Sequence, residues 1–213
     1  VNGVKSLLKG GCIHHDNGIL GACAYDSAET RKIRLLKDAG FNAVRTSHNP
    51  PSTALLDACD KEGILVIDEV HDEWELPKRK DSYHRHFPRL AVQDAQAMVR
   101  RDRSHPSVWC WSIGNEILDS FDRPDICLML KQAVLDCDPT RPVTAGLCRP
   151  WWPAPDWVDW ASSSEPGCRH LDIVGMNYMW KEVRPDHDRH PARLMMQTET
   201  YALDAWDSWK SVE

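Results

Sequence analysis

Short apolar runs alternate with helix-like patterns along almost the whole chain, and this alternation limits which folds are open to it. Residues 64–67 form an unbroken apolar run, as in a strand that is covered on both faces. Ser52 and Gly63 are a typical start and stop for the helix between them. The expected strands are 10–13, 41–45, 64–67, 107–114, 142–145, 171–176 and 194–198, and the expected helices are 27–39, 52–62, 90–103, 123–137 and 201–212.

Strands that alternate with helices in this way indicate βαβ crossovers and therefore a parallel sheet. Seven expected strands without a glycine-rich dinucleotide-binding motif favour a barrel over a doubly wound sheet. We predict an α/β fold of the TIM (β/α)8 type that is truncated before its eighth strand. Residues 1–213 are expected to form this single, partial barrel domain.

Charge and composition argue against several classes of function. The 213 residues carry a formal net charge of −6, so we expect no nucleic-acid partner. No stretch approaches the roughly 18 apolar residues of a membrane helix, and residues 1–5 lack the features of a signal peptide. We therefore predict no membrane partner, and the location stays open between the cytoplasm and the outside of the cell.

Polar residues follow the apolar part of nearly every expected strand. In a parallel barrel all these carboxyl ends open onto one face, where barrel enzymes keep their chemistry. Distant segments of the chain are therefore expected to converge on one pocket. The residues concerned are His14, Asp16, Arg45, His48, Asp68, Glu69, Asn115, Glu116, Asn177, Tyr178 and Glu199.

Glu116 and Glu199 end the fourth and seventh expected strands, which places them across the mouth of the barrel. Hydrolysis of a glycosidic bond requires one carboxylic acid that protonates the leaving oxygen. It also requires a second carboxylate that attacks the anomeric carbon or activates water. On spacing alone, two surface glutamates at the starts of loops are an equal alternative. The other polar strand ends favour the catalytic interpretation.

Several segments resemble the barrel motifs of glycoside hydrolase family 2, a family of retaining barrel glycosidases. The segment 105–116, H-P-S-V-W-C-W-S-I-G-N-E, is similar to the acid/base motif of that family. Four further segments resemble its successive barrel motifs in the same order. They are K-G-G-C-I-H-H-D (9–16), G-F-N-A-V-R-T-S-H-N-P-P (40–51), L-D-A-C-D-K-E-G-I-L-V-I-D-E (56–69) and Q-T-E-T (197–200).

The resemblance implies a role for individual residues. Glu116 is the implied general acid/base and Glu199 the implied nucleophile. Asn115 is implied to bind the 2-hydroxyl of the sugar, and Tyr178 to lie beside the nucleophile. The remaining positions implied to bind substrate or to orient the carboxylates are His14, Asp16, Arg45 and His48. Glu69 and Asn177 are further candidates for substrate binding because they lie at strand ends.

The resemblance also implies an activity and a molecular setting. We expect a retaining exo-β-glycosidase that hydrolyses terminal β-galactosides, with β-glucuronidase and β-mannosidase as alternatives. A barrel fragment that binds carbohydrate without turnover is a further alternative, because no eighth strand is expected. Related enzymes place β-sandwich domains before and after the barrel, so we expect such flanking domains in the full-length protein, and a homo-oligomer stays open.

No metal site or cofactor is expected. His14 and His15, with Asp16 or Glu69, have no fixed metal-ligand spacing. Some members of the resembled family bind Mg²⁺ near the site, but no motif in this chain identifies its ligands.

Two further groups of residues lie in or next to the expected loops. Four tryptophans there are candidates for stacking on a sugar ring. They are Trp74, Trp151, Trp152 and Trp180. The basic run Lys78, Arg79 and Lys80 is interpreted as a solvated loop surface.

Overall fold

The chain folds around one curled parallel sheet, as seen in a computed structural model that describes residues 1–149, 160 and 166–211. The strands follow one another in the sheet in the order of the sequence, and each pairs in parallel with the next. They are β1 (Gly10–His14), β2 (Ala43–Ser47), β3 (Leu65–Glu69), β4 (Val108–Asn115), β5 (Val143–Leu147), β6 (Ile173–Asn177) and β7 (Met195–Glu199).

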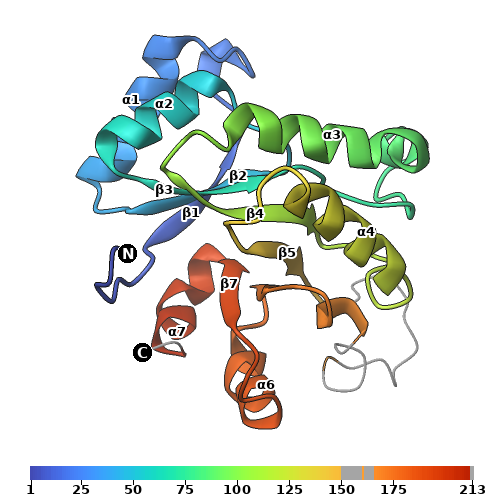
Figure 1. Cartoon of the computed structure of the whole chain (residues 1–213). Coiled ribbons are helices and arrows are strands. Elements are labelled where there is room, and N and C mark those ends of the chain that lie inside the picture. Colours follow the sequence, from blue (N-terminus) through green and yellow to red (C-terminus); the bar gives the residue numbers. More distant parts are fainter. Residues whose placement is uncertain (150–159, 161–165, 212–213) are drawn as a thin grey trace.

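Helices connect the strands and lie along the outer side of the sheet (Figure 1). The α-helices are α1 (Asp26–Asp38), α2 (Thr53–Glu62), α3 (Phe87–Asp102), α4 (Pro124–Leu135), α6 (Val183–Arg189) and α7 (Ala205–Lys210). Short 3-10 turns are η1 (Gly18–Leu20), η2 (Tyr83–Arg85), η3 (Trp180–Glu182) and η4 (Ala202–Asp204). The predicted class, a seven-stranded TIM-type barrel, is confirmed. No helix in the described ranges is long and apolar enough to cross a membrane.

Helix α2 begins and ends where its sequence predicts. The Ser52 hydroxyl accepts a hydrogen bond from the Leu55 amide, which satisfies a donor that the first turn leaves unpaired. Gly63 follows the helix with φ +67°, a left-handed conformation that glycine adopts without steric cost. The next strand can therefore turn back onto the sheet at once.

The edge strands β1 and β7 approach each other at their carboxyl ends. The Cys12 thiol on β1 lies 3.5 Å from the Thr198 carbonyl oxygen on β7. Arg45 of β2 places Nη1 3.5 Å from the same oxygen. The sheet thus curls until its first and last strands border one interior space.

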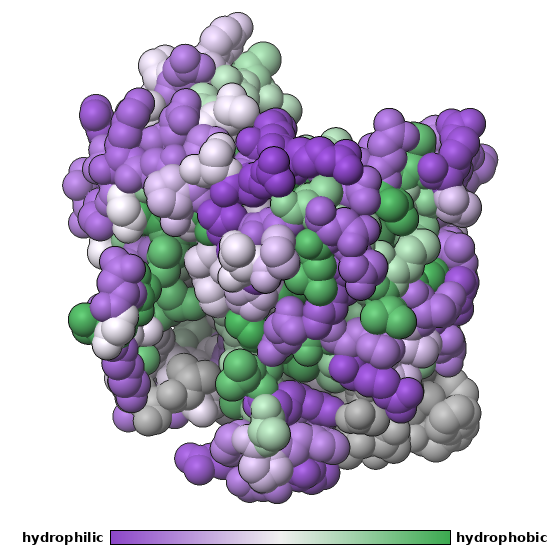
Figure 2. All heavy atoms as spheres, viewed as in Figure 1, coloured by the Kyte–Doolittle hydropathy of each residue, from purple (hydrophilic) through white to green (hydrophobic). Residues whose placement is uncertain are grey.

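Some large apolar side chains are exposed near these edge strands. Figure 2 shows hydrophilic residues over much of the surface, with hydrophobic residues exposed between them. Leu7 precedes β1 and Ile19 follows it, while Leu203 and Trp206 follow β7. Exposed apolar surface therefore accompanies the segments next to the sheet edges.

The hydrophobic core lies between the outer face of the sheet and the helices. Because side chains alternate along a strand, one set faces the helices and the other faces the barrel interior. On β3, Asp68 contacts Asp102 at the end of α3, whereas Glu69 contacts Arg45 in the interior. Core residues include Ile33, Leu56, Val66, Phe87, Val99, Trp111 and Leu130.

Asp68 therefore lies outside the pocket that its position at a strand end suggested. Its carboxyl group is fully buried. Burial, together with the Asp102 carboxylate beside it, raises the pKa of Asp68 well above its usual range. Asp68 therefore faces the end of α3 and not the barrel interior.

Helix α6 lies in a segment where the sequence pattern predicts no helix. Its residues are mostly charged and show no apolar periodicity. The fully buried carboxylate of Asp186 accepts hydrogen bonds from Trp160 Nε1 and Arg193 Nη1, both at 3.0 Å. Buried polar contacts of this kind stabilise a helix without leaving a periodic trace in the sequence.

Asp138 connects β4 to the loop before β5. One carboxylate oxygen accepts hydrogen bonds from the Thr140 amide and hydroxyl, and the other accepts from Arg141 and from Trp111 Nε1 at 3.1 Å. Burial alone would raise the pKa of Asp138, but these hydrogen bonds outweigh it and lower the pKa to about 2.

We predict that Asp138→Asn lowers the free energy of unfolding by about 2 kcal/mol at pH 7. The pKa of Asp138 in the folded protein lies below its unfolded value of about 3.9. The ionised side chain therefore contributes its full stabilisation above pH 4. This stabilisation is lost as the pH falls from about 4 to about 2, and the two proteins should converge in that window. Unfolding in guanidinium chloride at pH 7 and pH 3 measures the difference in free energy of unfolding between the wild type and Asp138→Asn. The exposed Asp122→Asn is the control. A difference that is unchanged at pH 3 would contradict the prediction.

Candidate active site

A buried arginine lies at the centre of the polar side chains gathered at the carboxyl ends of the strands. Arg45 on β2 is 3% exposed and donates two hydrogen bonds to Glu69 Oε2, at 2.9 Å and 2.6 Å. Arg45 also donates to Asn115 Oδ1 at 2.8 Å and to Glu199 Oε2 at 3.4 Å. Burial alone would lower the pKa of Arg45, but the Glu69 carboxylate outweighs it and raises the pKa. Arg45 therefore stays charged and links β2 to β3, β4 and β7.

Glu69 is buried beside Arg45 and holds its guanidinium group in place. Its side chain has no exposed surface. In addition to Arg45, its oxygens accept the Ser112 hydroxyl at 2.6 Å and lie 2.7 Å from His48 Nδ1. Glu69 thus orients Arg45 and His48 from a position beneath the surface of the pocket.

The two glutamates predicted to form a pair lie on either side of one amide. Asn177 at the end of β6 donates from Nδ2 to Glu199 Oε2 at 2.9 Å and to Glu116 Oε1 at 3.4 Å. The same nitrogen lies 2.9 Å from Asn115 Oδ1, and Thr198 donates to Asn177 Oδ1. The fully buried Asn177 therefore orients both carboxylates.

Two residues that follow strand ends have a left-handed backbone. Glu116 has φ +45° and Tyr178 has φ +58°, a conformation that is costly for residues other than glycine. The Glu116 amide donates to the Gly146 carbonyl at 2.5 Å, and the Tyr178 amide donates to the Glu199 carbonyl at 2.8 Å. These hydrogen bonds hold the strained conformation and set the direction in which the side chains leave the strands.

Gly146 on β5 leaves the room that Arg45 needs. A β-carbon at this position would lie 2.6 Å from Arg45 Nη2 and 3.0 Å from Asn177 Oδ1. Both distances are shorter than ordinary van der Waals contact. The glycine is therefore required by the close approach of the guanidinium to the β5 backbone.

Tyr178 donates its hydroxyl hydrogen to Glu199 Oε1 at 2.8 Å. Burial and the hydrogen bond to Glu199 raise the pKa of Tyr178, so the phenol remains a donor. Its ring stacks on Tyr201, with centroids 4.3 Å apart. Both oxygens of Glu199 are thus held by donors, which fixes the orientation of its carboxylate.

Two histidines lie beside Glu199 at the mouth of the pocket. The rings of His14 on β1 and His48 after β2 meet edge to face, with centroids 5.3 Å apart. One donor atom from each of His14, His48 and Glu199 lies within 4.8 Å of the others, close enough to hold a metal ion. The same atoms are equally suited to sugar hydroxyls, and Glu199 is already hydrogen bonded to Tyr178 and Asn177.

Other predicted residues have different positions. Asp16 is exposed, and its carboxylate accepts the Gly18 amide at 2.8 Å, which places it outside the hydrogen-bond network of the pocket. Trp74 is 1% exposed and donates Nε1 to the Ile113 carbonyl, so the stacking prediction is wrong for it. Trp151 and Trp152 lie outside the described residues.

Lys78 is one of the residues that the sequence interpretation missed, with Asp72 and Ser112. Its side chain is only 11% exposed, and it donates from Nζ to Asp72 at 2.7 Å and to the Asn115 carbonyl at 2.8 Å. The prediction of a solvated loop surface is therefore wrong for Lys78. The segment contains three basic residues in a row, and nothing in that pattern distinguishes the buried one.

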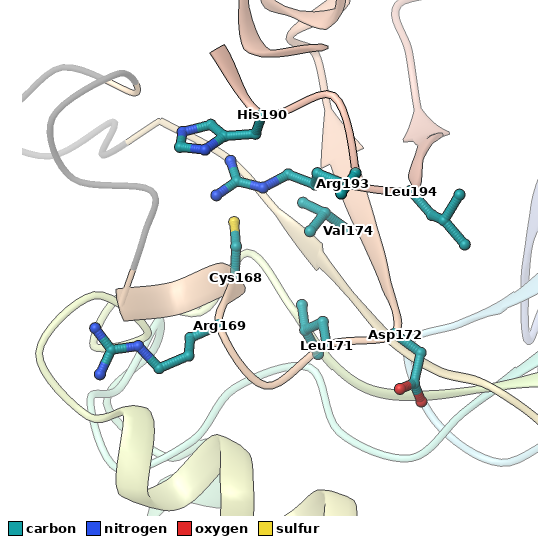
Figure 3. Close-up of a pocket in the computed structure, with 9 residues that line it drawn as sticks. Cys168, Arg169, Leu171, Asp172, Val174, His190, Arg193 and Leu194 are labelled. Atoms are coloured by element: carbon teal, nitrogen blue, oxygen red, sulfur yellow. The ribbon is translucent and has the colours of Figure 1, made fainter.

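A separate hollow of about 250 Å³ lies at the opposite end of the barrel (Figure 3). Leu171 and Asp172 line it just before β6, and Arg193 and Leu194 line it just before β7. These are the amino ends of the strands, whereas the two glutamates lie at the carboxyl ends. The hollow is therefore not part of the candidate site.

Comparisons with known proteins find similar sequences. Residues 1–149 match the family described as "Glycosyl hydrolases family 2, TIM barrel domain". The chain is 34% identical to the beta-galactosidase BoGH2A of Bacteroides ovatus, over 94% of this chain and 26% of that protein. It is 36% identical to a putative beta-glucuronidase of Formosa agariphila, over 70% of this chain and 14% of that protein.

Solved structures show the same similarity. A glycosyl hydrolase family 2 member from Bacteroides cellulosilyticus superposes with a TM-score of 0.91 at 49% identity, over 99% of this chain and 26% of that one. A beta-glucuronidase from Bacteroides uniformis gives 0.74 at 26% identity, over 91% of this chain and 24% of that one. The chain thus spans about a quarter or less of the length of these relatives.

We predict that Glu69→Gln destabilises the barrel by about 3 kcal/mol or more, because it removes the closest counter-charge of the buried Arg45. The matched control is Glu62→Gln, which removes the partner of the exposed Arg34 and should cost less than about 1 kcal/mol. Urea unfolding followed by tryptophan fluorescence measures both. Equal losses in the two variants would show that Arg45 does not depend on Glu69.

Proposed function

This chain belongs to glycoside hydrolase family 2, and on that basis we propose that it is the catalytic barrel of a retaining exo-β-glycosidase acting on terminal β-galactosides. One observation carries the proposal. The Asn177 amide nitrogen lies within hydrogen-bond distance of both Glu116 and Glu199, so the two carboxylates face one another across a single group. A paired acid and nucleophile require this arrangement.

The geometry supports retention of the anomeric configuration. Glu116 Oε1 and Glu199 Oε2 lie 3.4 Å and 2.9 Å from the same nitrogen, so they are no farther apart than those two distances together. Retaining enzymes hold the two carboxyl groups roughly 5–5.5 Å apart, and inverting enzymes hold them about 6.5 Å or more apart. A donor shared by the two carboxylates supports the closer spacing of a retaining pair.

In the first step of the proposed reaction, the Glu199 carboxylate attacks the anomeric carbon. The bond to the leaving oxygen breaks, and Glu116 gives its proton to that oxygen. In the second step, Glu116 accepts a proton from water, which attacks the anomeric carbon and releases Glu199. Tyr178, Asn177 and Arg45 donate hydrogen bonds to Glu199 and orient its carboxylate for the attack.

Two carboxyl groups and water complete both steps. The proposal therefore includes no metal and no cofactor. His14 and His48 border Glu199 and are proposed to donate to sugar hydroxyls, with His48 oriented by Glu69. Asn115 is proposed to act near the 2-hydroxyl, from its position beside Glu116.

The charges in the pocket favour a neutral sugar. Recognition of a glucuronide requires a cation that is free to bind its carboxylate. Among the described residues, the arginine and lysine that hydrogen bond to the candidate site residues are already paired, Arg45 with Glu69 and Lys78 with Asp72. The similarity to beta-glucuronidases keeps a glucuronide as the second candidate, and a β-mannoside as the third.

The whole protein is proposed to be larger than this chain. Its relatives are about four times as long, so we propose flanking domains, of the β-sandwich type, around the barrel. Experiments on activity should therefore use the full-length protein. A homo-oligomer is compatible with this proposal.

The catalytic pair predicts two graded losses. Glu199→Gln should abolish turnover of nitrophenyl β-galactoside, because no covalent intermediate can form. Glu116→Gln should lower kcat by about 10² to 10⁴-fold. A 2-fluoro β-galactoside should add one sugar mass to the peptide that contains Glu199, as measured by mass spectrometry. Glu62→Gln is the control; wild-type turnover in Glu199→Gln would overturn the assignment.

The sugar preference predicts an order within a panel of nitrophenyl β-galactoside, β-glucuronide and β-mannoside. The galactoside should have a kcat/KM at least about tenfold above that of the glucuronide, whose carboxylate would be left unpaired in the pocket. If another sugar is preferred, only the galactoside assignment fails. If the full-length protein turns over none of them, the proposed β-glycosidase activity fails.

A further inference from the structure

The loop between β3 and α3, residues 70–86, is anchored to the barrel rather than solvated. Glu73 is 2% exposed, and its two oxygens accept the backbone amides of Lys78 and His84, both at 2.7 Å. A buried carboxylate thus fixes the backbone on which Lys78 stands. The lysine side chain is directed to the end of β4 and away from solvent.

Lys78, Asp72 and Asn115 form a closed set of hydrogen bonds. Lys78 Nζ lies 2.7 Å from Asp72 Oδ1 and 2.8 Å from the Asn115 carbonyl oxygen. The same Asp72 oxygen accepts Asn115 Nδ2 at 2.9 Å. Burial alone would raise the pKa of Asp72, but Lys78 and Asn115 outweigh it and lower the pKa. Both the backbone and the side chain of Asn115 are therefore held by this loop.

The Asn115 carbonyl and the Glu116 amide belong to one peptide group. Lys78 binds the carbonyl side, and the Gly146 carbonyl binds the amide side at 2.5 Å. Glu116 needs such support, because its φ of +45° is strained and persists only when the surroundings determine it. Without Lys78, one of the two bonds that orient this peptide is lost.

We propose that Lys78 is a positioning residue that holds the Asn115–Glu116 peptide and so places the Glu116 carboxyl group for proton transfer. The proposal rests on the proposed role of Glu116 as the acid/base. Lys78 acts through the backbone, with its charge balanced by Asp72. The neighbouring Arg79 and Lys80 are exposed, and Lys80 therefore provides a matched control within the same loop.

The first test compares Lys78→Met with Lys80→Met in the full-length protein, using aryl β-galactosides whose leaving groups differ in pKa. The parameter is kcat/KM, which reports the first chemical step. For poor leaving groups that need the acid, Lys78→Met should lower kcat/KM about 100-fold, as expected for a misplaced catalytic group. For a dinitrophenyl leaving group, which needs little protonation, the loss should be a few-fold. Lys80→Met should match the wild type throughout.

A purely structural role gives a different pattern. Loss of correctly folded protein would lower kcat/KM equally for all leaving groups, and that result would overturn the proposal. Lys78→Arg keeps the charge and the donors, so it should recover part of the activity toward poor leaving groups. Melting temperatures of the variants verify that each remains folded.

A double-mutant cycle tests whether Lys78 acts through Glu116. In the Glu116→Gln background, adding Lys78→Met should cost less than about threefold, because the group that Lys78 positions is already absent. A loss as large as in the wild-type background would show that Lys78 acts on something else and would overturn the proposal.

Hydrogen exchange gives a readout that does not depend on activity. The Glu116 amide, bonded to Gly146, should exchange at least about tenfold faster in Lys78→Met than in Lys80→Met. If the full-length wild-type protein hydrolyses no β-glycoside, the proposed function fails, and exchange still decides whether Lys78 holds this peptide. Unchanged exchange at Glu116 would overturn the proposal.

Discussion

The buried charge of Arg45 is the constraint on which the rest of the site depends. A guanidinium removed from water costs several kcal/mol unless its charge and its donors are matched. Arg45 meets this requirement with Glu69 as counter-ion and with acceptors on β4 and β7. Because these partners come from separate strands, Arg45 links β2 to β3, β4 and β7.

The same network prepares the proposed chemistry. Asn177 orients Glu116 and Glu199 with one amide, and Tyr178 supplies a second donor to Glu199. The strained backbone at Glu116 is held between the β5 backbone and Lys78. Two carboxylates are thus given different surroundings: Glu199 accepts several donors, whereas Glu116 is oriented mainly by its backbone.

Patterns of the sequence were sufficient for the architecture and for most of the candidate site. Alternating periodicity predicts the strands, and the polar residues after them predict which segments meet, because parallel strands share one carboxyl edge. The failures have physical causes. Asp68 differs from Glu69 by one position, which turns it toward α3. Trp74 and Lys78 lie in an irregular loop whose residues have no period that tells a buried side chain from an exposed one.

By itself, the sequence determined the order of the β/α units and the family, since both are written in local patterns and contiguous motifs. Only the tertiary structure decided which strand-end residues touch. Asn177 lies between Glu116 and Glu199 and donates to both of them. Lys78 donates to the Asn115 carbonyl. Both contacts join residues that are far apart in the chain. Such contacts depend on the curl of the sheet and on the conformation of a loop, and neither is encoded by residues that are neighbours in sequence.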